Sequence, residues 1–380
     1  MSKLNVLFLA GWYPTDEKAT NAIFIKEHAI AVSSYCEIVV LTTNNTTKRK
    51  LFEIVSDRIE DGVRTIRFNY HRPYTKTQWL FYALGFFCVF RWLKKNGFTP
   101  DVIHGHIYYT SFIAIILSKL YNTPVILTEQ TSKFPKKMLT WSELKRTKFA
   151  MERANYVLPV SNFLKNSIKS YGIDANYRVV PNVVNINIFF PKHKVVKNCK
   201  EKKILTVALF GPDKGFEYLF ESFGELIKNR HDFVLDIIGD GPMADEYLKL
   251  TKQHKVNHII NFHGEKSKEE VAKYMRECDF FVLPSVIETF GTVYIEAMAC
   301  GKPVIGPRDL GPSDFINDQV GLLVSPRNIS ELTKAIEYML DNYDKYSPDN
   351  IFEYIKSSYS SESIGKFLLS IYEGVIEVEK

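Results

Sequence analysis

One stretch constrains the fold of this 380-residue chain more than any other: residues 283–306, which read LPSVIETFGTVYIEAMACGKPVIG. An apolar run ends at the start of this stretch, a loop carrying Glu288 follows, and the pattern predicts a helix that opens at Gly291. Gly301 stands where a left-handed helix cap usually falls, and Pro303 begins a further apolar run. A strand, a helix and a second strand therefore follow one another within a few residues, which is typical of an α/β protein.

Two carboxylates bracket the start of this predicted helix. Glu288 lies just outside the helix N-terminus, and Glu296 lies one turn inside it. The first N–H groups of a helix have no intrahelical partner, so they form a ready site for an anion. Two acids beside an anion site suit a ligand with many hydroxyls and a phosphate, which is the chemistry of a nucleotide sugar. The alternative interpretation is a capped helix with two surface acids.

The order of residues in this stretch resembles a known signature. Glu288, seven residues, Glu296 and then Ala-Met-Ala-Cys-Gly-Lys-Pro look like the Glu-x7-Glu motif of family 4 retaining glycosyltransferases, the glycosyltransferases group 1. The resemblance runs in order from about residue 5 to residue 345 and is strongest over residues 203–325. It implies the GT-B fold, an α/β architecture in which two Rossmann-like domains with parallel sheets face an interdomain cleft.

Charge and pattern divide the chain into two halves. Residues 1–190 carry 25 basic and 13 acidic side chains, a charge of +12, whereas residues 191–380 carry 24 and 30, a charge of −6. We predict an N-terminal Rossmann-like acceptor domain over 1–190 and a C-terminal Rossmann-like nucleotide-sugar domain over 191–355. The resemblance implies that a final helix over 356–380 crosses back to the N-terminal domain. A lysine-rich change of composition places the hinge near residues 183–202.

Short apolar runs alternate with helical patterns in both halves, which predicts two parallel sheets. Strands are predicted at residues 5–10, 37–42, 101–106, 124–128, 156–160, 204–210, 232–238, 258–263, 279–283 and 321–324. Helices are predicted at residues 23–32, 79–93, 108–121, 268–277, 328–340 and 361–378, and others open at Ser161, Phe216 and Gly291.

Polar residues of the N-terminal half end strands or open helices, where open α/β sheets bind ligands. His106 ends one predicted strand, and in similar enzymes a histidine there touches the donor sugar, so the resemblance makes His106 a catalytic candidate. His104, two residues deeper, is expected to pack in the core. Three further residues are candidates for the cleft: Glu129 at the end of the next strand, Ser161, which is first of all a helix cap, and Asn182 in a Pro-Asn segment.

The second half carries the expected donor site. Lys214 lies in a turn at the carboxyl end of a strand, where an ammonium can neutralise a leaving diphosphate without a metal. By the resemblance, Lys214 and Glu288 are catalytic; Glu288 holds hydroxyls of the transferred sugar, and Glu296 accepts hydrogen bonds from the ribose hydroxyls. The other donor-binding candidates contribute mainly backbone groups: Phe290, Gly291, Thr292, Gly239 and Gly241.

Two positions depart from the family pattern. Relatives carry an arginine five residues before the lysine of the donor site, and this chain has Leu209 there. Loss of that cation could weaken catalysis by several kcal/mol, judging by the value of oxyanion contacts. Similar enzymes often place a glycine late in the first loop, and Ala22 stands in that place here, which weakens the case for close phosphate approach.

The resemblance implies a hexosyltransferase that retains configuration at the anomeric carbon, the leaving phosphate taking the acceptor proton. The sequence has no DxD run and no His/Cys set at ligand spacing, so we expect no metal and no cofactor; the nucleotide-diphosphate sugar is a substrate. The expected acceptor is a glycan or a lipid-linked molecule of cell-surface polysaccharide synthesis. The alternatives are a catalytically silent GT-B protein that binds a sugar nucleotide or a partner enzyme, and a sugar-nucleotide epimerase.

The expected location is the cytoplasm, and peripheral contact with the inner face of a membrane is a hypothesis beside it. Five scattered cysteines (Cys36, Cys88, Cys199, Cys278 and Cys300) form no CxxC pair, and residues 1–10 read as a strand rather than a signal peptide. Residues 79–93 are almost wholly apolar, and a second, basic stretch surrounds Trp141, so an anionic membrane surface is a candidate partner. The alternative for 79–93 is a helix packed on the sheet. No nucleic-acid motif occurs, so no nucleic-acid partner is expected.

Overall fold

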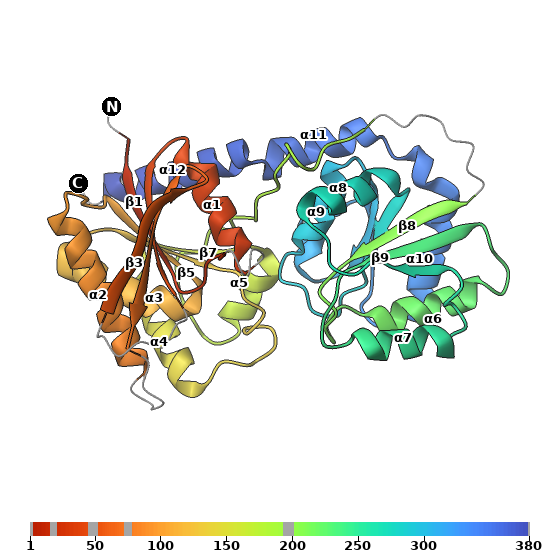
Figure 1. Ribbon diagram of the computed structural model, residues 1–380, viewed down its shortest axis with the longest axis horizontal. Helices are drawn as coiled ribbons and strands as arrows, with labels where there is room; N and C mark the ends of the chain where they lie inside the picture. The colour runs from red at the N-terminus through yellow and green to blue at the C-terminus, as the bar shows by residue number, and fades with distance from the viewer. Residues whose placement is uncertain (1–2, 16–20, 45–51, 72–77, 193–200, 379–380) are drawn as a thin grey trace. The chain divides into compact units, whose positions relative to one another are not determined.

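The computed structural model forms two compact units, one of residues 1–183 with 361–380 and one of residues 184–360. Each unit is built around its own sheet (Figure 1). The structure describes residues 3–15, 21–44, 52–71, 78–192 and 201–378. Cys199, one of the five scattered cysteines, lies outside the described part of the chain.

The sheet of the first unit has seven strands in the order β3-β4-β2-β1-β5-β6-β7. Neighbouring strands are parallel except β3 and β4, which form an antiparallel hairpin at one edge. The central strand β1 pairs with β2 and β5, so that Ala10 lies opposite both Thr42 and His106. The bounds are β1 (Asn5–Ala10), β2 (Glu37–Thr43), β3 (Phe52–Glu60), β4 (Val63–Tyr70), β5 (Val102–His106), β6 (Val125–Glu129) and β7 (Tyr156–Pro159).

Helices cover both faces of this sheet. On one face α1 and α12 pack against each other and against strand residues such as Val6 and Phe8, forming one apolar cluster. A Cβ added to Gly365 of α12 would lie 2.2 Å from the carbonyl oxygen of Ala31, so this helix crossing requires glycine. The helices are α1 (Ile23–Ser33), α2 (Gln78–Lys95), α3 (Ile107–Tyr121), α4 (Trp141–Met151), α5 (Asn162–Lys169) and α12 (Ser361–Val378).

The second unit has a six-stranded, wholly parallel sheet in the order β10-β9-β8-β11-β12-β13. Its strands are β8 (Lys202–Val207), β9 (Phe233–Ile238), β10 (Ile260–Phe262), β11 (Phe280–Val282), β12 (Val304–Pro307) and β13 (Gly321–Val324). Its helices are α6 (Phe216–Leu226), α7 (Ala244–Gln253), α8 (Lys268–Glu277), α9 (Thr292–Ala299), α10 (Ile329–Asn342) and α11 (Pro348–Tyr359), with 3-10 turns η1 (Gly311–Asp314) and η2 (Tyr343–Lys345).

The expected α/β architecture is confirmed, and most predicted elements are present with small shifts of their ends. The hairpin β3–β4 was not predicted, and it makes the first sheet mixed rather than parallel. Strand β8 ends at Val207, three residues earlier than predicted; the N–H groups of Ala208 and Phe210 still donate to the carbonyls of Ile238 and Asp240, outside the regular strand. None of the helices in the described part of the chain is long and apolar enough to cross a bilayer.

Candidate active site

Two predicted catalytic residues of the second unit meet directly. Lys214 Nζ and Glu288 Oε2 are 2.7 Å apart and form an ion pair. The side chains are 25% and 12% exposed, so the pair is partly shielded but open to solvent on one side. The ammonium and the carboxylate are therefore available together at the carboxyl ends of the parallel strands, where α/β sheets bind ligands.

Close backbone packing holds the two turns that carry this pair. Gly215 has φ +71°, and a Cβ on it would lie 2.1 Å from the carbonyl oxygen of Pro284. The N–H of Val286 donates to the carbonyl of Asp213 at 2.8 Å, which ties the turn before Lys214 to the loop before Glu288. The ion pair is thus placed by the backbone rather than by flexible side chains alone.

Helix α9 begins at Thr292, one residue after the predicted start, and Gly291 is its N-cap in a left-handed conformation (φ +83°). Phe290 is buried and packs on Phe315, with ring centroids 5.1 Å apart, so only its backbone remains for a ligand. Glu296 lies half-buried in the second turn of the helix. The structure therefore places Glu288 before the N-terminus of α9 and Glu296 within it, as the motif indicates.

Gly239 and Gly241 have a structural explanation. A Cβ on Gly239 would lie 1.9 Å from the carbonyl oxygen of Ala208, and one on Gly241 would lie 2.6 Å from that of Phe210. Both glycines let the end of β9 approach the end of β8. The donor-binding role expected of them stays a prediction.

Leu209 occupies the position of the family arginine, and its side chain is 72% exposed. An exposed leucine cannot neutralise a diphosphate. Lys214 is therefore the cation that the sequence motif and the structure both assign to this turn.

In the first unit, His106 ends β5 and is buried. Its ring stacks on His104 with centroids 4.2 Å apart and packs against Phe8 at 4.5 Å. Neither ring nitrogen has a hydrogen-bond partner in the described part of the chain. Burial, together with His104 and His28, holds the pKa of His106 well below its usual range, so the ring is neutral near pH 7 and can donate one hydrogen bond and accept one. Its expected contact with the donor sugar stays a prediction.

His104 packs in the core, as predicted. Its Nδ1 lies 2.8 Å from the hydroxyl of Tyr372 on α12, and its Nε2 lies 2.7 Å from Thr128 Oγ1 on β6. These contacts fix the ring on which His106 stacks.

The residue after His106 has a strained backbone. Ile107 opens α3 with φ +61°, a left-handed conformation that β-branched side chains rarely adopt. Such strain costs on the order of 1–3 kcal/mol and gathers at functional sites. Sequence reasoning missed it, because a positive φ at isoleucine leaves no signal in the sequence.

Glu129 ends β6, is buried and fixes the start of α3. Its Oε2 accepts from the N–H of Tyr108 at 2.7 Å, and its Oε1 accepts from Gln130 and Thr131 at 2.9 and 2.8 Å. Burial raises the pKa of this carboxyl, and the backbone donors oppose that rise. The structure thus gives Glu129 a capping function beside His106, and its place in a ligand cleft stays a prediction.

Ser161 lies between β7 and α5, and Asn182 lies next to Val183, where the first stretch of the same unit ends. Ser161 Oγ accepts from the N–H of Leu164 at 3.0 Å, which confirms its prediction as the N-cap of α5. Asn182 is buried and follows Pro181, whose carbonyl accepts a hydrogen bond from His28 Nε2 at 3.0 Å. Sequence reasoning missed His28 because it lies inside an apolar helical pattern.

Ala22, which stands where the resemblance places a glycine, has a left-handed backbone. It precedes α1 with φ +52° and ψ +35°, the left-handed region that glycine adopts most easily. An alanine in this conformation costs about 1 kcal/mol, which a glycine would not.

An aromatic and basic surface covers α2 and α4 of the first unit. The guanidinium of Arg146 lies 4.8 Å from the ring of Trp79, and Lys145 Nζ lies 3.6 Å from the ring of Trp141. Helix α3 contacts both α2 and α4, so the two stretches singled out in the sequence lie close together. We call this surface the aromatic–basic face, defined by Trp79, Trp141, Lys145 and Arg146; Trp141 is 72% exposed.

Metal-binding groups are absent from the part of the chain that the structure describes: no three His, Cys, Asp or Glu side chains are arranged to hold an ion. Cys36, Cys88, Cys278 and Cys300 form no disulfide.

Two family models match the chain. The model described as "Glycosyl transferases group 1" matches residues 187–356, and the model described as "Glycosyltransferase Family 4" matches residues 31–188. Together the two matches span both compact units. The Lys214–Glu288 pair lies within the match to "Glycosyl transferases group 1".

Individual proteins agree with these matches. An uncharacterized glycosyltransferase of Methanocaldococcus jannaschii is 27% identical over 298 residues, which cover 73% of this chain and 76% of that protein. A probable sucrose-phosphate synthase of Thermosipho melanesiensis is 25% identical over 390 residues, which cover 92% of this chain and 90% of that protein. Among solved structures, the Anabaena protein Alr3699/HepE in complex with UDP and glucose matches with a TM-score of 0.75 and 15% identity, covering 98% of this chain and 100% of that one.

Proposed function

Because this chain belongs to the group 1 glycosyltransferases of family 4, which have the GT-B fold, we propose that it is a retaining hexosyltransferase working without a metal. It moves a sugar from a nucleotide-diphosphate donor to a glycan or lipid-linked acceptor in cell-surface polysaccharide synthesis. The observation that carries this proposal is the Lys214–Glu288 ion pair, 2.7 Å long, beside the N-terminus of α9.

The chemistry of the pair suits a sugar diphosphate. When the donor binds, hydroxyls of the sugar hydrogen-bond to Glu288, and the ammonium of Lys214 turns to the diphosphate. Glu296 accepts from the ribose hydroxyls, and backbone N–H groups at the N-terminus of α9 donate to the phosphates. As the bond to the sugar breaks, negative charge grows on the leaving diphosphate, and Lys214 stabilises it.

His106 is proposed to orient the sugar from the first unit. Its ring is neutral, and both its nitrogens lack partners among the described residues, so it can hydrogen-bond a hydroxyl without bringing a charge. The acceptor hydroxyl attacks the anomeric carbon from the face that the diphosphate leaves, and it passes its proton to the leaving phosphate. Because the new bond forms on the face where the old one breaks, the configuration of the anomeric carbon is kept.

A donor screen tests the proposal first. UDP-, GDP- and ADP-sugars are added to the full chain, and the melting temperature is recorded, because a ligand that binds only the folded state raises it. UDP-glucose heads the panel, since a protein of this fold is known in complex with UDP and glucose. A panel that leaves the melting temperature unchanged would contradict the proposal.

Release of nucleotide diphosphate from the selected donor then tests the residues. Glu288→Ala and Lys214→Ala are each expected to lower the rate by at least about a hundredfold, the usual cost of losing one transition-state contact. The matched control is Lys228→Ala, which breaks the exposed 2.6 Å ion pair between Lys228 and Glu225 in the same unit. NMR of the product reports whether configuration is retained.

Leu209 favours a second candidate function, a silent GT-B protein that binds a sugar nucleotide without turning it over. Its exposed apolar side chain stands where relatives carry a cation for the diphosphate. Such a protein would show a donor-dependent rise in melting temperature together with no release of nucleotide diphosphate, with or without acceptor.

The aromatic–basic face supports contact with an anionic membrane. Indole rings paired with basic side chains suit the headgroup region, and the N-terminal half of the sequence carries a net charge of +12. In flotation with phosphatidylglycerol vesicles at low salt, the wild-type chain is expected to rise with the lipid. The variant Lys145→Glu/Arg146→Glu is expected to remain in the bottom fraction without lipid. Lys228→Glu, in the other unit, should float as the wild type does.

A further inference from the structure

Trp12 is an exposed indole at the carboxyl end of the central strand of the first unit. It is 36% exposed and lies two residues beyond Ala10, which is in register with His106. The ring of Tyr109, in the first turn of α3, is 14° from parallel to the indole, with centroids 6.4 Å apart. Strands β2 and β5 flank β1, so these rings lie at the topological switch point where open α/β sheets bind ligands.

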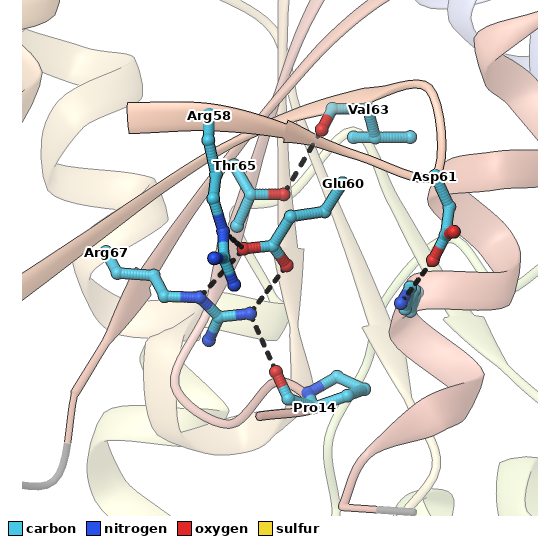
Figure 2. Close-up of polar contacts among 8 residues, drawn as sticks. Pro14, Arg58, Glu60, Asp61, Val63, Thr65 and Arg67 are labelled. Carbon is cyan, nitrogen blue, oxygen red and sulfur yellow. Dashed lines mark hydrogen bonds and ion pairs between the residues drawn. The ribbon is translucent and has the colours of Figure 1, made fainter. Parts of the chain in front are cut away.

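The backbone on both sides of Trp12 is fixed. Before it, the carbonyl of Gly11 accepts from Thr43 Oγ1 at 3.2 Å. After it, the buried ring of Tyr13 lies 5.6 Å from the guanidinium of Arg67. The carbonyl of Pro14 accepts from Arg67 Nη2 at 2.7 Å (Figure 2). An exposed side chain therefore stands on a segment that is held at each end.

Arg67 is itself held by the hairpin β3–β4. Its Nε and Nη2 donate to the two carboxylate oxygens of Glu60 at 3.1 and 2.7 Å, and Arg58 Nε donates to Glu60 Oε1 at 2.8 Å (Figure 2). The turn of the same hairpin is tied to α1 by the 2.5 Å ion pair of Asp61 with Lys26. Although burial pushes the pKa of Glu60 up, the two guanidinium groups hold it below its usual range, so the carboxylate stays charged.

Burying Arg67 in this arrangement lowers the free energy of unfolding. Arg67 is 6% exposed, and its Nη1 has no hydrogen-bond partner among the residues that the structure describes. An unmet buried donor normally destabilises a fold, and such groups call for an explanation. The geometry supplies one explanation: Arg67 fixes the two residues that follow the exposed indole of Trp12.

We propose that Trp12 and Tyr109 form an aromatic shelf on which a neutral sugar ring of the acceptor stacks, and that Arg67 is a positioning residue that holds Trp12 in place. A pyranose presents a face of C–H groups that packs on an aromatic face, and tryptophan offers the largest such surface. The shelf adjoins His106 in the register of β1 and β5. The inference rests on the proposed function, since it names the acceptor subsite of the same enzyme.

Ligand binding tests the shelf without any need for turnover. Methyl α-D-glucopyranoside and methyl α-D-mannopyranoside are titrated into the full chain and followed by saturation-transfer NMR. Trp12→Ala is expected to weaken binding of at least one glycoside by about tenfold or more, as for an aromatic anchor, and Trp12→Phe by less. The matched control is Phe367→Ala, an exposed aromatic of the same unit at 37% exposure. Equal affinities in Trp12→Ala and wild type, or no binding by wild type, would overturn the inference.

Arg67→Lys and Glu60→Gln test the positioning role. Both keep Trp12 but loosen its neighbours, so binding of the glycoside should weaken at a temperature well below unfolding, with Trp12→Ala adding little to Arg67→Lys. A residue that serves only the fold would lower the melting temperature and leave the affinity unchanged, which would overturn this role.

Kinetics separate this inference from the proposed function. Trp12→Ala should raise the KM for acceptor by about tenfold and leave hydrolysis of the donor by water unchanged. If wild type releases no nucleotide diphosphate while Trp12→Ala still loses glycoside binding, the proposed function fails and the shelf stands. Loss of vesicle flotation in Trp12→Ala, with glycoside binding intact, would instead assign the indole to a membrane and overturn the shelf.

Discussion

Acidification should destabilise the first unit through its buried histidines, and His28 allows the size of the effect to be worked out. The ring of His28 is buried on α1; its Nε2–H donates to the carbonyl of Pro181 at 3.0 Å, and its Nδ1 has no partner in the described part of the chain. Burial lowers the pKa of His28 from 6.5 to about 4. Burial also places the pKa values of His104 and His106 well below their usual range.

The sign follows from where the proton binds. Below pH 6.5 the unfolded chain protonates His28 while the folded chain does not, so the free energy of unfolding falls as the pH drops from 6.5 toward 4. A shift of about 2.5 units corresponds to about 3 kcal/mol in full, of which about 2 kcal/mol is lost at pH 5. Above pH 6.5 this residue contributes no pH dependence. The other two histidines act in the same direction.

Urea unfolding at pH 7 and pH 5, followed by tryptophan fluorescence, measures the loss. All four tryptophans (Trp12, Trp79, Trp92 and Trp141) belong to the first unit, so the signal reports on that unit. In His28→Gln, where the amide can still donate to Pro181, the pH dependence should shrink by about 2 kcal/mol. The control His258→Gln removes an exposed histidine of the other unit and should change nothing. Equal pH dependence in His28→Gln and wild type would refute the reasoning.

Three further predictions concern the donor site. Leu209→Arg restores the family cation five residues before Lys214 and should tighten binding of the donor diphosphate by about tenfold, measured by calorimetry; unchanged affinity would mean that this side chain does not face the diphosphate. Gly215→Ala, with φ +71° and a Cβ 2.1 Å from Pro284 O, should lower the free energy of unfolding by about 3 kcal/mol or more in thermal melts, and a variant as stable as wild type would contradict the packing described. Removal of metals with EDTA should leave donor turnover unchanged, and a loss restored by Mg²⁺ would rule out metal-independent transfer.

Local patterns were enough for elements whose signals lie within a few residues. Helices α8 and α12 have the predicted bounds. For α8 the reason is visible in the structure, where the side chain of Ser267 accepts from the N–H of Glu270 and that of Glu270 accepts from Ser267 in return. Such a capping box is written in the sequence and needs no tertiary contact.

The hairpin β3–β4 was missed because a turn signal in the sequence was not used. Its turn is Asp61–Gly62, with φ of +48° and +82°, a strong hairpin signal that sequence reasoning did not use. Strand β3 lies at the edge of the sheet, mixes charged and apolar residues without regular alternation and has no buried residue, so its hydrophobic pattern is weak. Without this hairpin, the role of Arg67 could not be inferred.

The candidate site was predictable residue by residue, but its contacts were not. The motif singled out Lys214 and Glu288, yet they are 74 residues apart, and only the folded unit brings them to 2.7 Å. Glu129 looked like a cleft residue because it ends a strand, whereas its carboxylate is occupied by three backbone N–H groups. Burial of this kind depends on tertiary packing, which no local pattern records.

Calorimetric binding of UDP and UDP-glucose, or of whichever donor the screen selects, tests the central claim most directly when Lys214→Met and Glu288→Gln are compared. If the ammonium faces the diphosphate and the carboxylate faces the sugar, Lys214→Met should weaken both ligands by about tenfold or more, and Glu288→Gln should weaken only the sugar nucleotide. Unchanged affinity of both variants for the sugar nucleotide would contradict the claim that this ion pair binds an activated sugar.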